Sequence, residues 1–193
     1  MRQILRLVPL FLVATALLAS APAGAASAGS QIVRQQLAEL LAVVAQEPLI
    51  QGETVEAAVE IKITPGYHVN ANPPSEDWLI ATEVSVRGPT GIAVHKAFYP
   101  QALEKKFDFW ETPLRVYEGN VVVGMILEIA ADAPLGDRDL EIQVRYQACN
   151  DEACFAPVEA KYTVPVTIAP AGTAIRAASS PLLDRAPFER GQR

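Results

Sequence analysis

Two cysteines, Cys149 and Cys154, carry the only thiol chemistry of this 193-residue chain. They lie in the stretch Tyr-Gln-Ala-Cys-Asn-Asp-Glu-Ala-Cys-Phe-Ala-Pro, which spans positions 146–157. Two cysteines separated by four residues can close a small disulfide ring, and their thiolates can exchange with the disulfide of another protein. The pair therefore predicts either a redox-active site or a small structural staple.

The size and the charge of this ring bear on the choice between a redox site and a staple. A ring of about six residues contributes only ~2 kcal/mol by the chain-entropy estimate, less than a bridge between strands distant in sequence. Asp151 and Glu152 lie inside the ring, and nearby negative charge disfavours a thiolate. We therefore expect a poor general nucleophile that still exchanges electrons with a docked partner, because the partner supplies the attacking thiolate.

Metal and hydrolase sites have little support in the sequence. Two cysteines with His68 and His95 make a four-ligand set on paper, but neither Cys-x-x-Cys nor His-x-x-x-His spacing supports it. Each histidine is predicted to be a surface or turn residue with an ordinary hydrogen bond. Signatures such as Gly-x-Ser-x-Gly, a phosphate-binding glycine-rich loop and His-Glu-x-x-His are absent. We expect neither a metal nor a cofactor.

The N-terminus predicts export. Arg2 and Arg6 precede an apolar run from Leu7 to Ala19, and Ala23-Gly24-Ala25 follows as a small-x-small cleavage site. The run is shorter than the roughly 20 apolar residues that cross a bilayer, so we expect a cleaved signal peptide over 1–25 and no membrane insertion of the mature chain. The cysteines then enter an oxidising compartment. The acidic balance, a net charge of -6, makes nucleic acid a poor partner.

The middle of the chain follows the period of β-strands. From Thr54 to Ile63, apolar residues alternate with mainly charged ones, as in a half-buried strand. Turn-forming Pro, Gly, Asn and Asp separate the later runs, which span 82–87, 92–99, 114–117, 120–130, 139–147 and 158–168. Seven or eight short strands without intervening helices predict an all-β antiparallel β-sandwich over 40–168.

Residues 26–39 form a lead-in that is helical under one of two interpretations. Between residues 30 and 45, apolar residues recur at spacings of three and four, which fits one face of a helix. A first strand from Leu40 to Ala45 fits as well, because Val43 and Val44 favour strands. Both interpretations stay open.

Residues 169–193 are rich in Ala, Pro, Ser and Arg and have no sustained period. This composition predicts a flexible tail. The alternative is a docking segment that uses Leu182, Leu183 and Phe188.

Several short motifs resemble, in their order and spacing, the N-terminal periplasmic domain of the thiol:disulfide interchange protein DsbD. They are Gly66 to Pro74, Leu79 to Val84, Tyr99-Pro100, Tyr117-Glu118-Gly119 and the stretch from Tyr146 to Cys154. The likeness runs from about Leu40 to Ile168. It implies an immunoglobulin-like sandwich, located in the periplasm.

The resemblance also implies a function and site residues. The family's cysteine pair accepts electrons from a thioredoxin-like domain and passes them to oxidised periplasmic thiol proteins, as a component of a protein-disulfide reductase. By this likeness Cys154 forms the mixed disulfide and Cys149 resolves it. A cap that shields the pair corresponds to Phe107, Asp108, Phe109 and Trp110.

This sequence departs from the family in two ways. Ala81 and Ala156 stand where the family often has proline, a change that affects loop stiffness more than chemistry. The sequence contains neither a multi-helix membrane domain nor a thioredoxin-like domain, so we expect a separate donor, thioredoxin-like or a DsbD/CcdA-type membrane protein. The alternative function is a non-enzymatic exported binding or adaptor domain with a structural disulfide.

Overall fold

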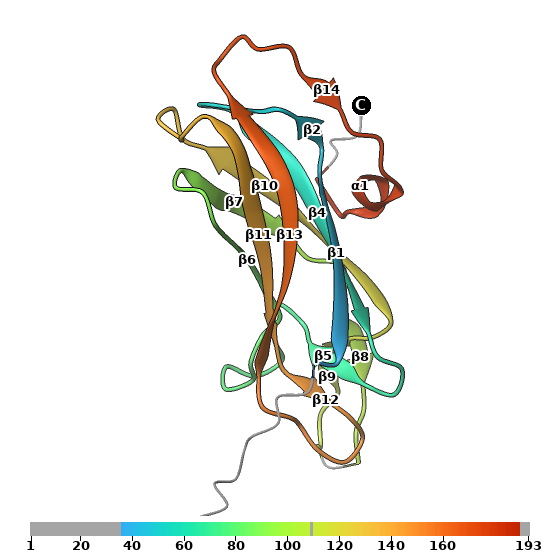
Figure 1. Cartoon of the computed structure of the whole chain (residues 1–193). Coiled ribbons are helices and arrows are strands. Elements are labelled where there is room, and N and C mark those ends of the chain that lie inside the picture. Colours follow the sequence, from blue (N-terminus) through green and yellow to red (C-terminus); the bar gives the residue numbers. More distant parts are fainter. Residues whose placement is uncertain (1–35, 109, 190–193) are drawn as a thin grey trace, which may run out of the picture. The chain divides into compact units, whose positions relative to one another are not determined.

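The computed structural model describes residues 36–108 and 110–189 (Figure 1). All the described residues belong to one compact unit. The predicted signal peptide over 1–25 lies outside the described residues. No helix within the described ranges is long and apolar enough to span a bilayer.

The first large sheet is antiparallel and has the strand order β1-β4-β10-β7. Its strands are β1 (Ala38–Val44), β4 (Thr54–Ile63), β7 (Ile92–Phe98) and β10 (Asn120–Ile129). The predicted inner face of β4 is confirmed, because its alternate side chains are all buried in the main core: Val55, Ala57, Val59, Ile61 and Ile63.

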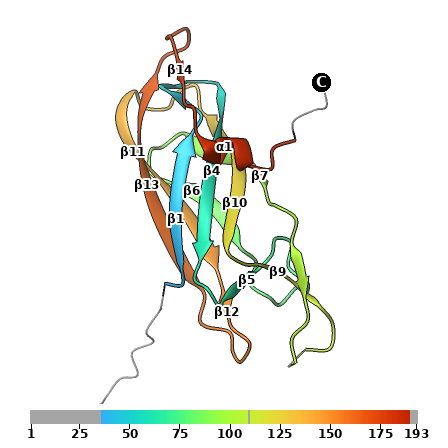
Figure 2. The same ribbon diagram turned by 90° about the vertical axis from the view of Figure 1, so that its right-hand side faces the viewer.

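The second large sheet has the order β3-β13-β11-β6. Its strands are β3 (Leu49–Ile50), β6 (Glu83–Arg87), β11 (Gly136–Tyr146) and β13 (Val158–Ala169). All pairs are antiparallel except that of β3 with β13. Inward residues such as Ile142 and Val144 share one core with Val123 and Met125 of the first sheet. The two sheets therefore form the predicted all-β, immunoglobulin-like sandwich (Figure 2).

The open question about residues 30–45 is settled for the described part, which is a strand. β1 pairs with β4 along its whole length, from Ala38 opposite Ile63 to Val44 opposite Ala57. Ala38 and Val44 are buried whereas Leu41 is 49% exposed, so side chains alternate between the two faces as in a strand. Sheet pairing with β4 outweighs the local helical spacing. Residues 26–35 of the predicted lead-in lie outside the described ranges.

A third, smaller sheet lies at the end of the sandwich where β11 leads into β12 (Figure 2). Its order is β12-β5-β9-β8, with strands β5 (His68–Asn70), β8 (Leu103–Lys105), β9 (Leu114–Tyr117) and β12 (Ala148–Cys149). Of these strands, only β9 was predicted from the sequence. Because β12 ends at Cys149, this small sheet carries the cysteine chemistry.

The flexible tail predicted for residues 169–193 is wrong for the described residues 169–189. β13 runs to Ala169, β14 (Arg176–Ala177) pairs with β2 (Gln46–Glu47), and the short helix α1 (Pro181–Arg185) follows. Leu182 and Leu183 are buried against the outer face of the first sheet. The docking segment, the alternative that the sequence also offered, is the one that the structure contains.

Candidate functional site

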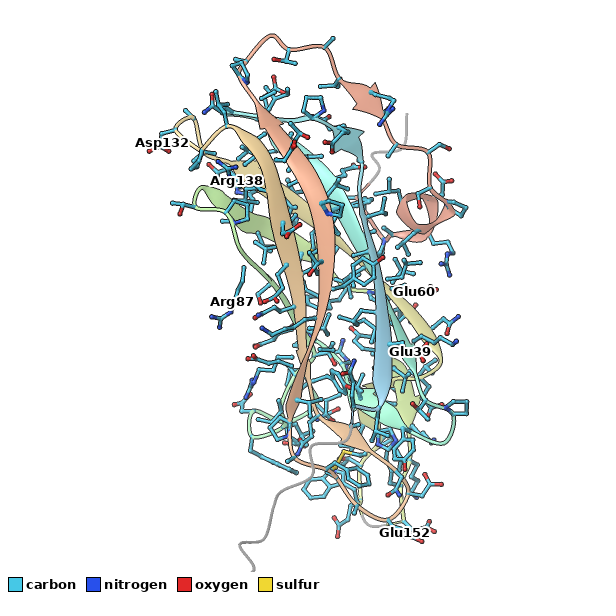
Figure 3. The ribbon with its side chains drawn as sticks, in the orientation of Figure 1. Glu39, Glu60, Arg87, Asp132, Arg138 and Glu152 are labelled. Atoms are coloured by element: carbon cyan, nitrogen blue, oxygen red, sulfur yellow. A yellow bond between two sulfur atoms is a disulfide. The ribbon has the colours of Figure 1, made fainter. Side chains whose placement is uncertain are left out.

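Cys149 and Cys154 form a disulfide, with their Cα atoms 4.0 Å apart. The two backbones also pair as an isolated antiparallel bridge. Cys149 is the last residue of β12 and is only 1% exposed, whereas Cys154 is an exposed residue of the following loop. Figure 3 shows the yellow disulfide bond at the same end of the sandwich as Glu152. The two halves of one bond therefore differ sharply in their access to solvent.

The loop between the cysteines is closed by its own hydrogen bonds as well as by the disulfide. The Asn150 Oδ1 atom accepts from the backbone N–H of Glu152 at 2.9 Å and of Ala153 at 2.8 Å. The Asn150 N–H in turn donates to the Ala153 carbonyl at 3.0 Å. An asparagine that binds the backbone two and three residues later is a common way to build a tight turn. This turn leaves Asp151 and Glu152 exposed.

His68 lies directly beside the disulfide in the small sheet. β5 pairs with β12 in a register that sets His68 opposite Cys149. Its exposure is 2%, so the prediction that it is a surface or turn residue is wrong. The reason is that the chain enters strand β5 at His68, immediately after the turn at Pro65 and Gly66.

His95, the second histidine, is a surface residue as predicted. It lies on β7 with an exposed side chain, 3.8 Å from a carboxylate oxygen of Glu128. It is not part of the small sheet. Among the described residues, no group of three or more His, Cys, Asp and Glu side chains is placed to hold a metal ion.

The segment predicted as a cap packs partly over this site. Phe107 is 4% exposed and stacks on His68, with 4.4 Å between the ring centroids. Trp110 is half-buried and meets the exposed Trp78 edge to face at 5.3 Å. Asp108 points into solvent, and Phe109 is outside the described residues. Phe107 thus contacts His68 directly, and Trp110 packs against the cluster that Phe107 forms with Leu79, Leu114 and Val116.

Lys105 gives the site a positive charge that the sequence analysis did not single out. Its ammonium pairs with Glu118 and lies 4.0 Å from a carboxylate oxygen of Asp151. Burial lowers the pKa of His68, and Lys105 lowers it further, while Glu118 and Asp151 oppose that shift. The imidazole is therefore neutral at neutral pH, because its ordinary pKa of 6.5 is already below 7.

Side-chain amides hold the neighbouring loop onto β5. The Asn70 amide donates to the Ile80 carbonyl at 3.0 Å, and the Asn72 amide donates to the Thr82 carbonyl at 3.0 Å. The Thr82 hydroxyl donates back to the Asn70 carbonyl at 2.7 Å. Asn70 and Asn72 therefore help to position the site. That His68 lies in the same motif, 66–74, is the one sequence signal that pointed to its role.

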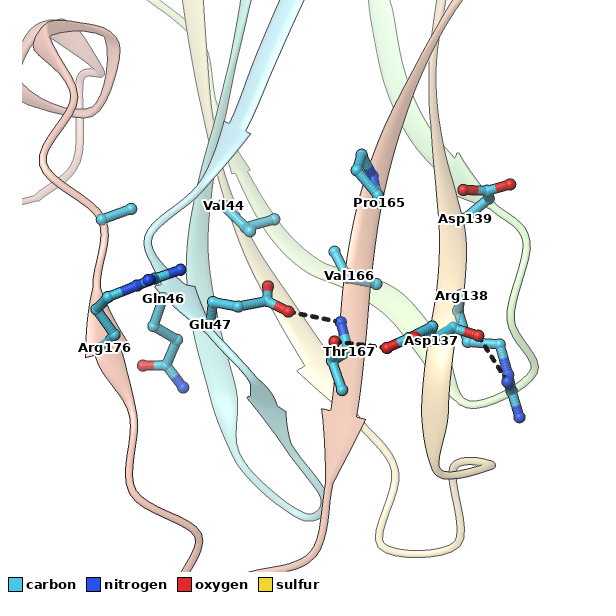
Figure 4. Close-up of a pocket in the computed structure, with 11 residues that line it drawn as sticks. Val44, Gln46, Glu47, Asp137, Arg138, Asp139, Pro165, Val166, Thr167 and Arg176 are labelled. Carbon is cyan, nitrogen blue, oxygen red and sulfur yellow. Dashed lines mark hydrogen bonds between the residues drawn. The ribbon is translucent and has the colours of Figure 1, made fainter.

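A groove of about 830 Å³ runs between β2, β11, β13 and β14, and no cysteine lines it (Figure 4). Two of its carboxylates already serve the fold: Glu47 Oε1 accepts from the Thr167 N–H, and Asp137 Oδ1 accepts from the Thr167 hydroxyl, both at 2.8 Å. We therefore interpret this groove as a seam between the sandwich and its C-terminal segment. The cysteine pair lies at the small sheet instead.

Known structures with a related fold include two from Neisseria meningitidis. The DsbD N-terminal domain in the reduced form is 16% identical, with a TM-score of 0.37, over 70% of this chain and 90% of that one. The complex between the DsbD N-terminal and PilB N-terminal domains is 15% identical, with a TM-score of 0.37, over 63% of this chain and 80% of that one. The N-terminal periplasmic domain of ScsB from Proteus mirabilis is 14% identical, with a TM-score of 0.45, over 69% of this chain and 47% of that one.

Sequence comparison is more decisive than these distant structural likenesses. No curated protein sequence matches the chain. The family model described as thiol:disulfide interchange protein DsbD, N-terminal, matches residues 37–166, which is well over half of the chain and runs from just before β1 into β13. The chain therefore belongs to the family of N-terminal domains of the thiol:disulfide interchange protein DsbD.

Proposed function

We propose that this protein relays reducing equivalents in the periplasm by thiol-disulfide exchange through Cys149 and Cys154. The observation that carries this proposal is the unequal burial of the pair. Cys154 is exposed and Cys149 is 1% exposed, so a thiolate of a docked partner reaches Cys154 first. Access to the attacked sulfur is one of the factors that set the rate of exchange.

Each half of the relay moves two electrons. A donor thiolate attacks the Cys154 sulfur, the Cys149–Cys154 bond breaks, and Cys149 leaves as a thiolate that takes up a proton. The second thiolate of the donor then attacks the donor sulfur of the mixed disulfide and releases Cys154. The donor ends as a disulfide and the domain as a dithiol. The same steps in reverse reduce the disulfide of an acceptor.

The partners follow from the family and from the chemistry. The donor is a thioredoxin-like protein or a DsbD/CcdA-type membrane protein, and the acceptors are oxidised exported proteins. Membership of a family named for thiol:disulfide interchange supports this assignment. The chain then acts as one component of a protein-disulfide reductase.

The cap of this relay is the segment 107–110. Phe107 closes over His68, the strand neighbour of Cys149, while Asp108 stays in solvent. A docked partner displaces this segment as it reaches the disulfide. The buried ring of Phe107 supports this role, because it ties the segment to the small sheet without a covalent bond.

The reduction potential of Cys149–Cys154 tests the proposed function. The purified protein is equilibrated in graded thiol buffers, and the oxidised fraction is read by mass spectrometry. A relay requires a value in the range of known exchange proteins, about -120 to -270 mV. A value below roughly -300 mV marks a structural disulfide, and it would leave a stapled binding or adaptor domain in place of the relay.

A trapping experiment tests the order of the two cysteines. Replacing Cys149 with Ala removes the resolving thiol, so a mixed disulfide with a thioredoxin-like protein should accumulate on Cys154. Cys154→Ala is the matched control, and it should form little adduct because Cys149 is buried. Adducts of equal yield on both variants would contradict the assigned roles.

A further inference from the structure

Three backbone segments place both cysteines and His68 in one lateral row of the small sheet. Cys154 bridges to Cys149, and Cys149 lies opposite His68. The pairing of β5 with β9 sets Val69 opposite Tyr117, so the next step of that register brings Glu118 beside His68. Residues directly opposite on antiparallel strands project from the same face, with Cβ atoms about 5 Å apart. The imidazole and the cysteine side chains therefore share one face.

The surroundings of His68 are closed and carry both signs of charge. Phe107 stacks on the imidazole. The charged groups that act on it are Lys105 from β8, Glu118 after β9 and Asp151 from the cysteine loop. Burial and Lys105 lower the pKa of His68, so a nitrogen lone pair is free to accept a proton at neutral pH.

Cys149 needs such an acceptor once the disulfide is open. A thiol attacks only as its thiolate, and a buried site disfavours that charged form. Cys149 is 1% exposed, so bulk water has little access to its proton. In the lateral row, His68 is the titratable side chain directly across from Cys149.

We propose that His68 accepts the proton of the Cys149 thiol when Cys149 attacks a mixed disulfide on Cys154; this inference rests on the proposed function and deepens it. The proton moves to the imidazole, and the Cys149 thiolate attacks the Cys154 sulfur. The Cys149–Cys154 bond forms as the bond from Cys154 to the partner's sulfur breaks. The partner leaves as a thiolate and is then protonated. The Glu118 carboxylate stabilises the imidazolium that forms.

The test follows this one step without a physiological partner. The reduced, full-length protein reacts with dithio-bis-nitrobenzoate, which places a nitrothiobenzoate group on Cys154 and releases one chromophore. Attack by Cys149 then releases the second chromophore, and its rate is recorded from mildly acidic to mildly alkaline pH. The reagent replaces both the donor and the acceptor, so this rate tests only the role of His68. The relay itself is tested separately by the reduction potential of Cys149–Cys154.

We expect His68→Gln to slow the second release about tenfold or more at neutral pH, because a general base typically accelerates a reaction by at least that factor. The wild-type rate should level off once the imidazole is neutral, whereas the variant rate should keep rising with pH as hydroxide takes over. His95→Gln is the matched control, because His95 is exposed on β7, and it should follow the wild type.

Either of two results would overturn the proposal. One is a second release in His68→Gln with the rate and pH profile of the wild type. The other needs no variant and holds even if the substitution disturbs folding. In the wild type, the rate must bend at the pKa of His68 measured by NMR on the reduced protein, and a rate that rises through that pH without a bend rules out His68 as the acceptor.

Discussion

The two cysteines differ in what surrounds them, although only four residues separate them. Cys149 ends a strand and is covered by the small sheet, while Cys154 lies in the exposed loop that Asn150 stabilises. We expect iodoacetamide to alkylate Cys154 of the reduced protein several-fold faster than Cys149, because access limits this reaction at the buried thiol. Peptide mass spectrometry over a time course measures both rates. Equal rates would show that reduction opens the site around Cys149.

A second prediction at the residue scale concerns Tyr146, which is fully buried. Its hydroxyl accepts the Leu37 N–H at 3.1 Å, so it anchors the chain at the start of β1. Tyr146→Phe leaves that buried N–H without its partner, and we expect the free energy of unfolding to fall by about 1–3 kcal/mol. Urea unfolding measures the loss. Tyr162→Phe is the control, since the half-buried Tyr162 hydroxyl makes no hydrogen bond within the described residues, and it should change stability little.

At the scale of elements, the C-terminal segment completes the outer face of the first sheet. Leu182 and Ala186 of this segment are buried against Ala58 and Val122. Gly124 allows the close approach of the last residues, because a Cβ there would lie 2.8 Å from the Phe188 ring. Ala58 on β4 and Gly124 on β10 thus leave room for α1 and the residues that follow it. The alternation of apolar residues alone does not predict this contact.

We expect Leu182→Ala to lower the free energy of unfolding by about 2–3 kcal/mol, the low end for a buried leucine, since α1 covers the outside of the sheet. The matched control is Ile175→Ala in the same segment, because Ile175 is 52% exposed and should cost less than about 0.5 kcal/mol. Chemical unfolding compares the two. A loss for Leu182→Ala as small as that expected for Ile175→Ala would mean that the segment does not pack on the folded domain.

Element length explains which parts of the fold the sequence predicts. The ten residues of β4 alternate long enough to give its bounds and its buried face from pattern alone. β5, β8 and β12 have two or three residues each, too few for a period to emerge. The cysteines were found by residue type. His68 was missed because its role depends on the register between β5 and β12, which is a tertiary property.

The cap segment yields a further prediction at this scale. Phe107→Ala removes the ring that stacks on His68 and loosens the segment from the small sheet. We expect dithiothreitol to reduce the Cys149–Cys154 disulfide several-fold faster in this variant, because the sulfurs become more accessible. Asp108→Ala is the control, since Asp108 is already exposed. Unchanged reduction in Phe107→Ala would show that the segment does not limit access.

At the scale of the whole described unit, a rigid sandwich supports a small reactive sheet. β4 leads into β5, and β11 leads into β12, so two long core strands deliver His68 and Cys149 to neighbouring positions. Each of these long strands is paired on both sides in its own sheet. The site therefore draws its geometry from the stable core, while its exposed sulfur and its cap lie on loops.

Burying a neutral histidine makes the stability of this unit depend on pH. The pKa of His68 is lower in the folded protein than its ordinary value of 6.5, chiefly through burial and also through Lys105. Between those two values the unfolded chain binds more protons, so acid favours unfolding. We expect the free energy of unfolding to be unaffected by His68 above about pH 7, and to fall as the pH drops below 6.5 towards the folded pKa.

His68→Gln should remove this dependence, and urea unfolding of both proteins from pH 7 down to about pH 5 measures it. His95→Gln should keep the wild-type slope, because His95 is exposed. Glu141, whose pKa is lowered by hydrogen bonds from Lys161 and Gln143, also makes acid destabilising, but only below its ordinary 4.5 and equally in every variant. Parallel pH curves for the wild type and His68→Gln would show that His68 is protonated as easily when folded as when unfolded. The imidazole would then lack the burial that its proposed role at Cys149 requires.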